Sequence, residues 1–132
     1  MGVVVLIVDD DEAVRFFHRI IVSQSGLSNE PLCFCNGEEA LNFLNANLNE
    51  ANTYLILLDI NMPVMNGWDF LDMINDKSYC NQVNIVIVTS SVDKADHEKA
   101  KLYNMVVEFV EKPISGEEYK RIMDFYSVVQ TF

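Results

Sequence analysis

The chain has 132 residues, half of them hydrophobic, and a formal net charge of −11 from 9 basic and 20 acidic side chains. This length and hydrophobic content predict one domain, residues 1–132, with a substantial core. The negative charge disfavours direct binding to nucleic acid or to an anionic membrane. No apolar run approaches the ~20 residues of a membrane-spanning helix, and the first eight residues lack the features of a secretory signal. We therefore expect a soluble cytoplasmic protein.

The first part of the chain alternates apolar runs of strand length with segments of helical length. The runs Val3–Val8, Leu32–Cys35 and Tyr54–Leu58 predict three strands. Between the first two, Glu12–Ser25 places apolar residues at spacings of three and four, as one stripe of a helix requires. Glu38–Asn47 has an apolar stripe of the same kind, so a second helix is predicted there.

The same alternation continues toward the C-terminal end. Trp68–Lys77 is predicted to be a helix with one apolar face, and Val83–Val88 a strand. Asp93–Tyr103 is mostly polar and charged, which indicates a helix that is largely solvated. Met105–Val110 predicts a fifth strand, and Ser115 is a suitable N-cap for a last helix.

Strands that are apolar on both faces and alternate with helices predict an α/β fold with a parallel sheet covered on both sides. Right-handed crossovers then bring the carboxyl end of every strand to the same edge. In open sheets of this kind the ligand site lies outside that edge.

Polar side chains follow four of the five predicted strands. In chain order they are Asp9-Asp10-Asp11, Asp59, Thr89-Ser90-Ser91 and Lys112-Pro113. Taken singly, each cluster has an ordinary structural explanation as a helix cap, a loop or a surface turn. Acids, a hydroxyl and an ammonium at one sheet edge favour a single functional site instead.

The three acids at this edge predict a metal site. Asp9, Asp10 and Asp59 would repel one another if they converged, and a cation would keep them ionised. Magnesium fits because it prefers oxygen ligands and typically uses one or two carboxylates. A backbone carbonyl just after Asp59 could be another ligand.

The chemistry that such a site favours is phosphoryl transfer. A carboxylate such as Asp59 can attack phosphorus and form an aspartyl-phosphate. Lys112 can neutralise one phosphoryl oxygen, and Thr89 can donate a hydrogen bond to another. With the metal, these groups would cover the three equatorial oxygens, and such charge stabilisation is most of what phosphoryl transfer needs.

Four segments in order resemble the receiver domain of two-component response regulators, and the resemblance covers nearly the whole chain. The segments are Leu6-Ile7-Val8-Asp9-Asp10-Asp11, Asp59-Ile60-Asn61-Met62-Pro63 with Gly67, Thr89-Ser90-Ser91 and Glu111-Lys112-Pro113. The resemblance implies a flavodoxin-like doubly wound (βα)5 fold, a three-layer sandwich whose parallel five-stranded sheet has the order 2-1-3-4-5.

The resemblance also implies roles for the site residues. Asp59 would be the phosphoacceptor, with Thr89 and Lys112 reaching toward the phosphoryl group. Asp9 and Asp10, together with Asp59, would hold Mg²⁺. The remaining implied roles belong to the Asn61 main-chain carbonyl as a metal ligand, to Phe109 as a packing switch, and to Asn61 and Ser91 as residues that tune hydrolysis.

By the same resemblance the protein would be primarily a signalling switch, and it is expected to catalyse its own phosphorylation and dephosphorylation at Asp59. The phosphoryl donor would be a phosphohistidine on a sensor histidine kinase or a histidine phosphotransfer protein, approaching the first helix near His18 and Arg19. The output would be protein binding by the face of the fourth helix, fifth strand and fifth helix. The downstream protein is unknown, and relay to another protein or homodimerisation is left open.

Two other functions are compatible with parts of the sequence. A haloacid dehalogenase-type phosphatase would use Asp9 as nucleophile and Asp11 as the second acid, although the chain is short for such an enzyme. An interaction domain that works without phosphorylation could use the same fold.

The remaining reactive side chains are expected to be structural. Cys33 and Cys35, two apart on a strand, predict a buried pair of thiols, and the paired spacing of a zinc site is missing. His18, beside Arg19, is expected at the surface or at its boundary with the core, and His97, among charged residues, is expected to be solvated.

Overall fold

A computed structural model describes residues 2–25, 30–90 and 93–130, and the side chains of all of these except residues 25, 123 and 125–130. Its sheet has five parallel strands in the order β2-β1-β3-β4-β5. The strands are β1 Gly2–Val8, β2 Leu32–Phe34, β3 Asn52–Leu58, β4 Val83–Thr89 and β5 Val106–Glu111. The predicted α/β fold and strand order are therefore confirmed.

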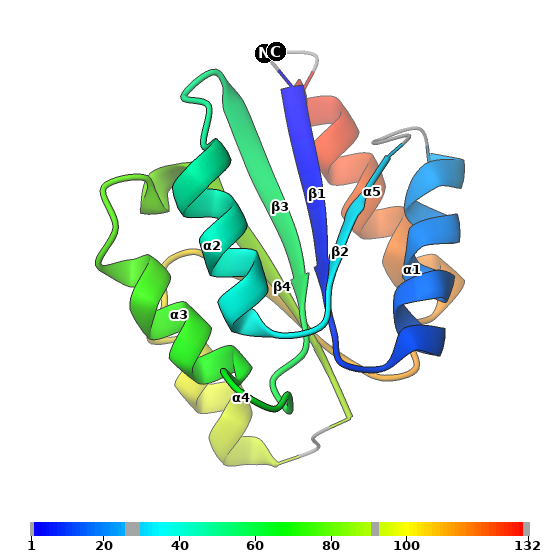
Figure 1. Cartoon of the computed structure of the whole chain (residues 1–132). Coiled ribbons are helices and arrows are strands. Elements are labelled where there is room, and N and C mark those ends of the chain that lie inside the picture. The colour runs from blue at the N-terminus through cyan, green and yellow to red at the C-terminus, as the bar shows by residue number, and fades with distance from the viewer. Residues whose placement is uncertain (1, 26–29, 91–92, 131–132) are drawn as a thin grey trace.

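Helices cover both faces of the sheet, and Figure 1 shows α1 and α5 on one side and α2, α3 and α4 on the other. Their bounds are α1 Glu12–Ser25, α2 Gly37–Asn47, α3 Gly67–Asn75, α4 Lys94–Ala100 and α5 Gly116–Gln130, with a 3-10 turn, η1, at Cys80–Gln82. These layers form the predicted three-layer sandwich.

The central strands are buried on both faces because alternate side chains enter opposite layers. In β1, Leu6 packs in the core under α2 and α3, whereas Ile7 packs in the core under α1 and α5. The same alternation in β3 and β4 accounts for their unbroken apolar runs, which are typical of parallel sheets.

Short polar side chains begin several of the helices. Asn36 accepts a hydrogen bond from the backbone of Glu39 and caps α2. Ser115 and Glu118 exchange hydrogen bonds between side chain and backbone at the start of α5, which is a capping box. The predicted N-cap at Ser115 is therefore confirmed.

The fourth helix is shorter than its sequence predicts. The prediction was Asp93–Tyr103, but α4 spans only Lys94–Ala100, with Asp93 as its N-cap. After the helix, the backbone N–H groups of Leu102 and Tyr103 donate to carbonyls three residues earlier, so the chain leaves the helix in tight turns.

His18 is buried, and the prediction of a surface or boundary histidine is wrong. It is 4% exposed, and its ring meets that of Tyr119 edge-on with centroids 5.6 Å apart. Positions four apart on a helix share a face, and Val22 one turn later is also buried. His18 therefore belongs to the stripe of α1 that packs toward α5.

The predicted pair of buried thiols is also wrong. Cys33 is exposed and Cys35 is partly exposed. β2 is a three-residue strand at the edge of the sheet, where the covering layers are incomplete. The Cys35 thiol donates to Glu39 Oε1 at 3.2 Å.

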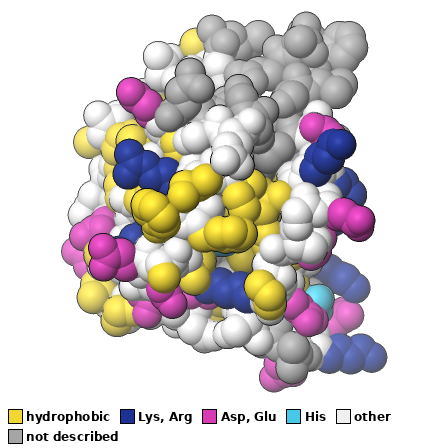
Figure 2. Space-filling view, turned by 90° about the vertical axis from the view of Figure 1, so that its right-hand side faces the viewer, with side chains coloured by type: hydrophobic (Ala, Val, Ile, Leu, Met, Phe, Trp, Pro, Cys, Tyr) yellow, Lys and Arg dark blue, Asp and Glu magenta, His cyan; other side chains and the backbone are white. Residues whose placement is uncertain are grey.

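Part of the outer surface of α1 is apolar. Phe16, Phe17 and Ile20 are 66%, 49% and 40% exposed, and Figure 2 shows hydrophobic side chains gathered on the face that carries α1 and α5.

None of the helices in the described part of the chain is both long and apolar enough to cross a membrane.

Candidate functional site

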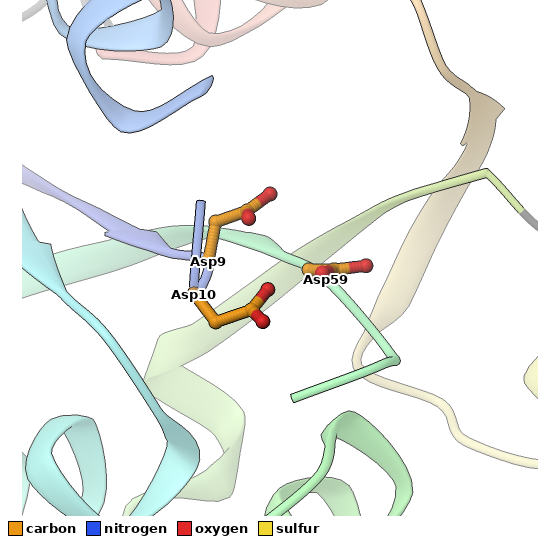
Figure 3. A group of neighbouring side chains, drawn as sticks. All are labelled: Asp9, Asp10 and Asp59. Atoms are coloured by element: carbon orange, nitrogen blue, oxygen red, sulfur yellow. The ribbon is translucent and has the colours of Figure 1, made fainter. Parts of the chain in front are cut away.

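Three aspartates meet at the carboxyl edge of the sheet, as predicted. Asp9 and Asp10 follow β1 and Asp59 follows β3, and each offers a carboxylate oxygen within 4.8 Å of the others (Figure 3). Asp9 and Asp59 are 2% and 5% exposed, whereas Asp10 is exposed. The cluster is therefore a buried acidic site that opens to solvent on the side of Asp10.

Backbone pairing places the two buried acids. The Asp9 N–H donates to the carbonyl of Phe34 at 3.1 Å, and the Asp59 N–H donates to the carbonyl of Val8 at 2.9 Å. These bonds extend the sheet by one residue at the ends of β1 and β3. The strands therefore hold both carboxylates side by side where the chain turns out of the sheet.

Gly67 allows the loop after Asp59 to fold back on itself. Its N–H donates to the carbonyl of Ile60 at 2.9 Å. A Cβ at this position would lie 2.7 Å from the carbonyl oxygen of Asp59 and 2.8 Å from the Cα of Ile60. Only glycine fits this close approach of the start of α3 to the acidic loop.

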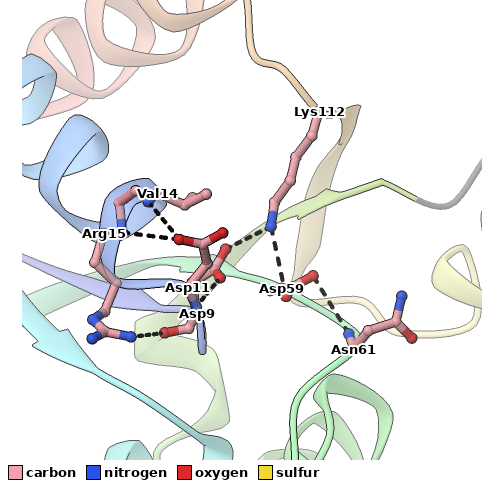
Figure 4. Close-up of polar contacts among 8 residues, drawn as sticks. Asp9, Asp11, Val14, Arg15, Asp59, Asn61 and Lys112 are labelled. Atoms are coloured by element: carbon pink, nitrogen blue, oxygen red, sulfur yellow. Dashed lines mark hydrogen bonds and ion pairs between the residues drawn. The ribbon is translucent and has the colours of Figure 1, made fainter.

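Lys112 binds both buried acids. Its Nζ lies 2.7 Å from Asp9 Oδ2 and 3.6 Å from Asp59 Oδ2 (Figure 4). The Lys112 N–H also donates to the carbonyl of Thr89 at 2.7 Å, which fixes the residue after β5 to the end of β4. Thr89 itself is fully buried at the same edge. The structure thus brings residues of all four predicted clusters, namely Asp9, Asp10, Asp59, Thr89 and Lys112, to one edge of the sheet.

Two residues just after the acids shape the site. The Asn61 N–H donates to Asp59 Oδ1 at 3.4 Å, and Asp11 accepts from the backbone of Ala13 and Val14, so it caps α1. Asn61 is exposed beside the cluster. Ser91, the other residue predicted to tune hydrolysis, lies outside the described residues.

Arg15 is a site residue that the sequence did not reveal. Its guanidinium donates to the main-chain carbonyl of Asp9 at 2.6 Å (Figure 4). The only sequence feature is a basic residue one turn into the helix that follows the acids, and such residues are ordinarily solvated. Arg15 therefore fixes the acidic loop to α1 by a contact that spacing alone does not predict.

The electrostatics of the cluster favour a bound cation. Burial, followed by the charge of Asp9, raises the pKa of the Asp59 carboxyl to about 6, and Lys112 opposes this rise. Burial disfavours the Lys112 ammonium, but the hydrogen bond to Asp9 and the charges of both acids together raise its pKa. One ammonium does not compensate three carboxylates, and this set of hard oxygen donors suits a divalent cation.

Phe109, the predicted switch residue, lies on β5 and is partly buried. Its ring packs against the core under α2 and α3. It also contacts His97 of α4, with ring centroids 3.8 Å apart.

Residues 5–124 match the family model of the response regulator receiver domain, so the chain belongs to this family of two-component signalling proteins. Among its relatives, chemotaxis protein CheY1 of Helicobacter pylori is 29% identical over 119 residues, which are 90% of this chain and 92% of CheY1. The crystal structure of a two-component response regulator from Cytophaga hutchinsonii superposes with a TM-score of 0.82 at 28% identity, covering 99% of this chain and 98% of that one.

A second group of relatives is much longer. The autoinducer 1 sensor kinase/phosphatase LuxN of Vibrio harveyi is 31% identical over 119 residues, which are 90% of this chain but only 13% of LuxN. Receivers therefore occur among these relatives both as nearly whole proteins and as parts of sensor kinases.

Proposed function

We propose that this chain is the phosphoacceptor receiver of a two-component or phosphorelay system and that Asp59 accepts the phosphoryl group. The observation that carries this proposal is the setting of the Asp59 carboxylate. It is 5% exposed, lies beside Asp9 and Asp10 with carboxylate oxygens within 4.8 Å, and has the Lys112 ammonium 3.6 Å away.

The transfer step begins with a carboxylate oxygen of Asp59 attacking the phosphorus of a phosphohistidine. A P–O bond forms as the P–N bond breaks, and the electron pair of that bond returns to the imidazole, which leaves. The product is a mixed anhydride, an aspartyl-phosphate. A carboxyl with a pKa of about 6 is mostly ionised at neutral pH, as the attack requires.

Lys112 and Thr89 stabilise the phosphoryl group. Lys112 neutralises one phosphoryl oxygen, and the Thr89 hydroxyl donates a hydrogen bond to another. Because the Lys112 ammonium is closer to Asp9 than to Asp59, it changes its principal partner as the phosphoryl group arrives. This exchange of partners links the presence of a phosphoryl group on Asp59 to the position of Lys112 and the segment that follows β5.

Mg²⁺ is the metal that this site would take. Asp9, Asp10 and Asp59 would hold it together with the main-chain carbonyl of Asn61, since magnesium prefers carboxylate and carbonyl oxygens. When bound, it supplies the positive charge that offsets repulsion among the acids and between Asp59 and a phosphoryl group.

Phosphorylation at Asp59 would be reversed by hydrolysis within the same site. Asn61 and Ser91 would border the path of the attacking water and so tune the rate. The exposed side chain of Asn61, beside the carboxylate, supports this role for one of the two residues.

The output would be a population shift of the surface formed by α4, β5 and α5. A phosphoryl group held by Thr89 and Lys112 favours one arrangement of β5, and Phe109, three residues before Lys112, changes its packing with it. A downstream protein that binds this arrangement better reads the signal.

The donor would dock on α1. Phe16, Phe17 and Ile20 expose apolar surface there, and α1 begins directly after the acidic loop. Exposed apolar patches of this kind mark protein interaction sites. A sensor histidine kinase or a histidine phosphotransfer protein covering the patch would bring its phosphohistidine to the site edge. His18 is buried and takes no direct part in this surface.

Intact mass spectrometry with acetyl phosphate and Mg²⁺ tests the proposed phosphoacceptor. We expect one phosphoryl adduct on the wild-type protein, no adduct on Asp59→Ala, and no adduct when EDTA replaces Mg²⁺. Asp11→Asn is the matched acidic control, because Asp11 caps α1, and it should keep the adduct.

The same experiment separates the alternatives. If Asp9→Asn abolishes the adduct while Asp59→Asn leaves it intact, the phosphatase with Asp9 as nucleophile is correct and the receiver proposal fails. The interaction domain that works without phosphorylation predicts no magnesium-dependent response to beryllofluoride, a phosphoryl mimic.

A further inference from the structure

One histidine of α4 contacts two residues of β5. The His97 ring centroid lies 3.8 Å from that of Phe109, with the ring planes at 37°. His97 Nε2 also lies 3.4 Å from Glu111 Oε1. Residues two apart on a strand share a face, so a single side chain spans the β5 surface that faces α4.

We propose that His97 is a positioning residue that holds the Phe109 ring in place and stabilises the unmodified arrangement of α4 and β5. The inference deepens the proposed function, because it rests on Phe109 changing its packing when Asp59 is phosphorylated. His97, which was expected to be solvated, would then control how readily Phe109 changes its packing.

The burial of these side chains supports a role in positioning. The His97 side chain is 36% exposed and Glu111 is 50% exposed, so the outer edge of the contact is open. Phe109 is partly buried and packs on the core under α2 and α3. The Phe109 ring therefore contacts both the core and His97, and a change in its packing disturbs the contact with His97.

A second cluster anchors α4 to α3. Lys99 Nζ lies 4.6 Å from the centroid of the Trp68 ring, and Trp68 stacks on Tyr103 with centroids 6.1 Å apart. The Tyr103 hydroxyl donates to Asp72 Oδ1 at 2.5 Å. These contacts connect α4 and the turn after it to α3. Because α4 is also held to α3, a change in the packing of Phe109 breaks its contact with His97 unless α4 shifts as well.

The energetic consequence follows from a two-state equilibrium. Contacts made only in the unmodified arrangement lower the fraction of protein molecules in the conformation that binds a phosphoryl group. The apparent affinity for a phosphoryl group or its mimic falls by the same factor. Removing an aromatic contact of this kind should raise that affinity about two- to tenfold. His97→Ala removes both contacts and keeps a good helix former in α4.

Beryllofluoride titration in Mg²⁺, followed by the fluorescence of Trp68, tests the proposal. Trp68 is the single tryptophan and contacts Lys99 of α4. We expect His97→Ala to bind the mimic about two- to tenfold more tightly than wild type. His97→Phe, which keeps a ring over Phe109, should return toward wild type. Glu98→Ala, whose partner is Lys101 on the same helix turn, is the control and should be unchanged.

A second measurement needs neither metal nor mimic. In protein labelled with ¹³C-phenylalanine, the Phe109 ring signals, assigned with Phe109→Leu, should broaden by exchange in His97→Ala and stay sharp in Glu98→Ala. Wild-type affinity together with unbroadened Phe109 signals in His97→Ala would overturn the inference.

The two measurements distinguish this inference from the proposed function. If wild type shows no magnesium-dependent response to beryllofluoride, the proposed function fails, and the Phe109 signals then decide whether His97 holds the ring. If wild type responds and His97→Ala matches Glu98→Ala in both measurements, only the inference about His97 is wrong.

Discussion

Lys112 Nζ lies 2.7 Å from Asp9 Oδ2, which is closer than its 3.6 Å distance to Asp59. Without a metal, the Lys112 ammonium thus serves as the counter-ion of the buried Asp9 carboxylate. This contact joins the residues that follow β1 and β5. It also means that a cation and Lys112 compete for the same carboxylate.

Lys112→Met should therefore destabilise the protein in EDTA far more than in Mg²⁺. Removing one partner of a buried ion pair leaves an uncompensated charge, and we expect a loss of about 2–4 kcal/mol in the free energy of unfolding. Mg²⁺ should restore most of this loss, because it supplies the missing positive charge. Urea unfolding in each condition gives the two values.

The control for Lys112 is Lys101→Met. Lys101 pairs with Glu98 at 3.2 Å, but both side chains are mostly exposed. Exposed pairs contribute about 0–1 kcal/mol, so this variant should stay near wild type with or without Mg²⁺. Equal losses for Lys112→Met in EDTA and in Mg²⁺ would contradict the counter-ion role.

Asp59 should make the metal-free protein less stable as the pH rises from about 4 to about 6. Its pKa in the folded protein is about 6, above the ordinary value of 3.8. In this window the folded state binds more protons than the unfolded state, so the free energy of unfolding falls with rising pH. Asp59→Asn should be more stable than wild type by about 1–3 kcal/mol at pH 7.5 in EDTA.

That gain should fall to well under about 1 kcal/mol near pH 4, where the Asp59 carboxyl is protonated in the folded state and about half protonated in the unfolded state. Urea unfolding of both proteins at pH 4, 5.5 and 7.5 measures it. A constant difference between the two proteins over this range would show that Asp59 is not the group responsible. Mg²⁺ at pH 7.5 should narrow the difference, because wild type keeps the carboxylate that holds the metal.

His18 should act in the opposite direction at acid pH. Burial lowers its pKa from 6.5 to about 4, so the unfolded state takes up the proton first. Stability is lost as the pH falls from about 6.5 to about 4, by up to about 3 kcal/mol. His18→Leu, which fills a buried position without titrating, should flatten this acid limb in urea unfolding. An unchanged acid limb in His18→Leu would rule His18 out.

The fold was predictable because it depends on local pattern. Strands such as Tyr54–Leu58 are apolar on both faces, and only a sheet covered on two sides accommodates several of them. The convergence of Asp59 and Lys112 was predictable for the same reason, since parallel strands place their carboxyl ends at one edge. Boundaries were less predictable. α4 ends at Ala100, where tight turns lead the chain into β5. The sequence did not indicate this end, because the residues between Ala100 and β5 include neither proline nor glycine.

Contacts between elements were not predictable from spacing. His18 looked like a surface residue beside Arg19, but the position of α5 puts it opposite Tyr119. His97 lies among charged residues, and its contact with Phe109 depends on where α4 rests against β5. Such contacts join residues from different elements, and a sequence pattern reports only the face on which each residue lies.

Gly67→Ala should disrupt the loop that carries Asp59. The added Cβ would lie 2.7 Å from the Asp59 carbonyl oxygen, so the backbone of α3 or of the loop must shift. We expect a loss of about 1–3 kcal/mol in stability, and slower modification by acetyl phosphate because the carboxylate moves. Gly116→Ala is the matched control, since no atom lies within 4 Å of its Cβ position. Similar effects of the two substitutions would contradict the close-approach argument.

Val64 should be a site where a substitution stabilises the protein. Its φ is 70°, in the left-handed region that β-branched residues rarely adopt, and its side chain is 75% exposed. Asparagine tolerates this region better, so Val64→Asn should gain about 1 kcal/mol in stability. Val107→Asn is the control, because Val107 is an exposed residue of β5 without positive φ, and there the change should lower stability. Thermal unfolding of wild type and both variants at one pH shows whether each substitution raises or lowers the melting temperature. If Val64→Asn melts at or below the wild-type temperature, the backbone at this position is not strained in solution.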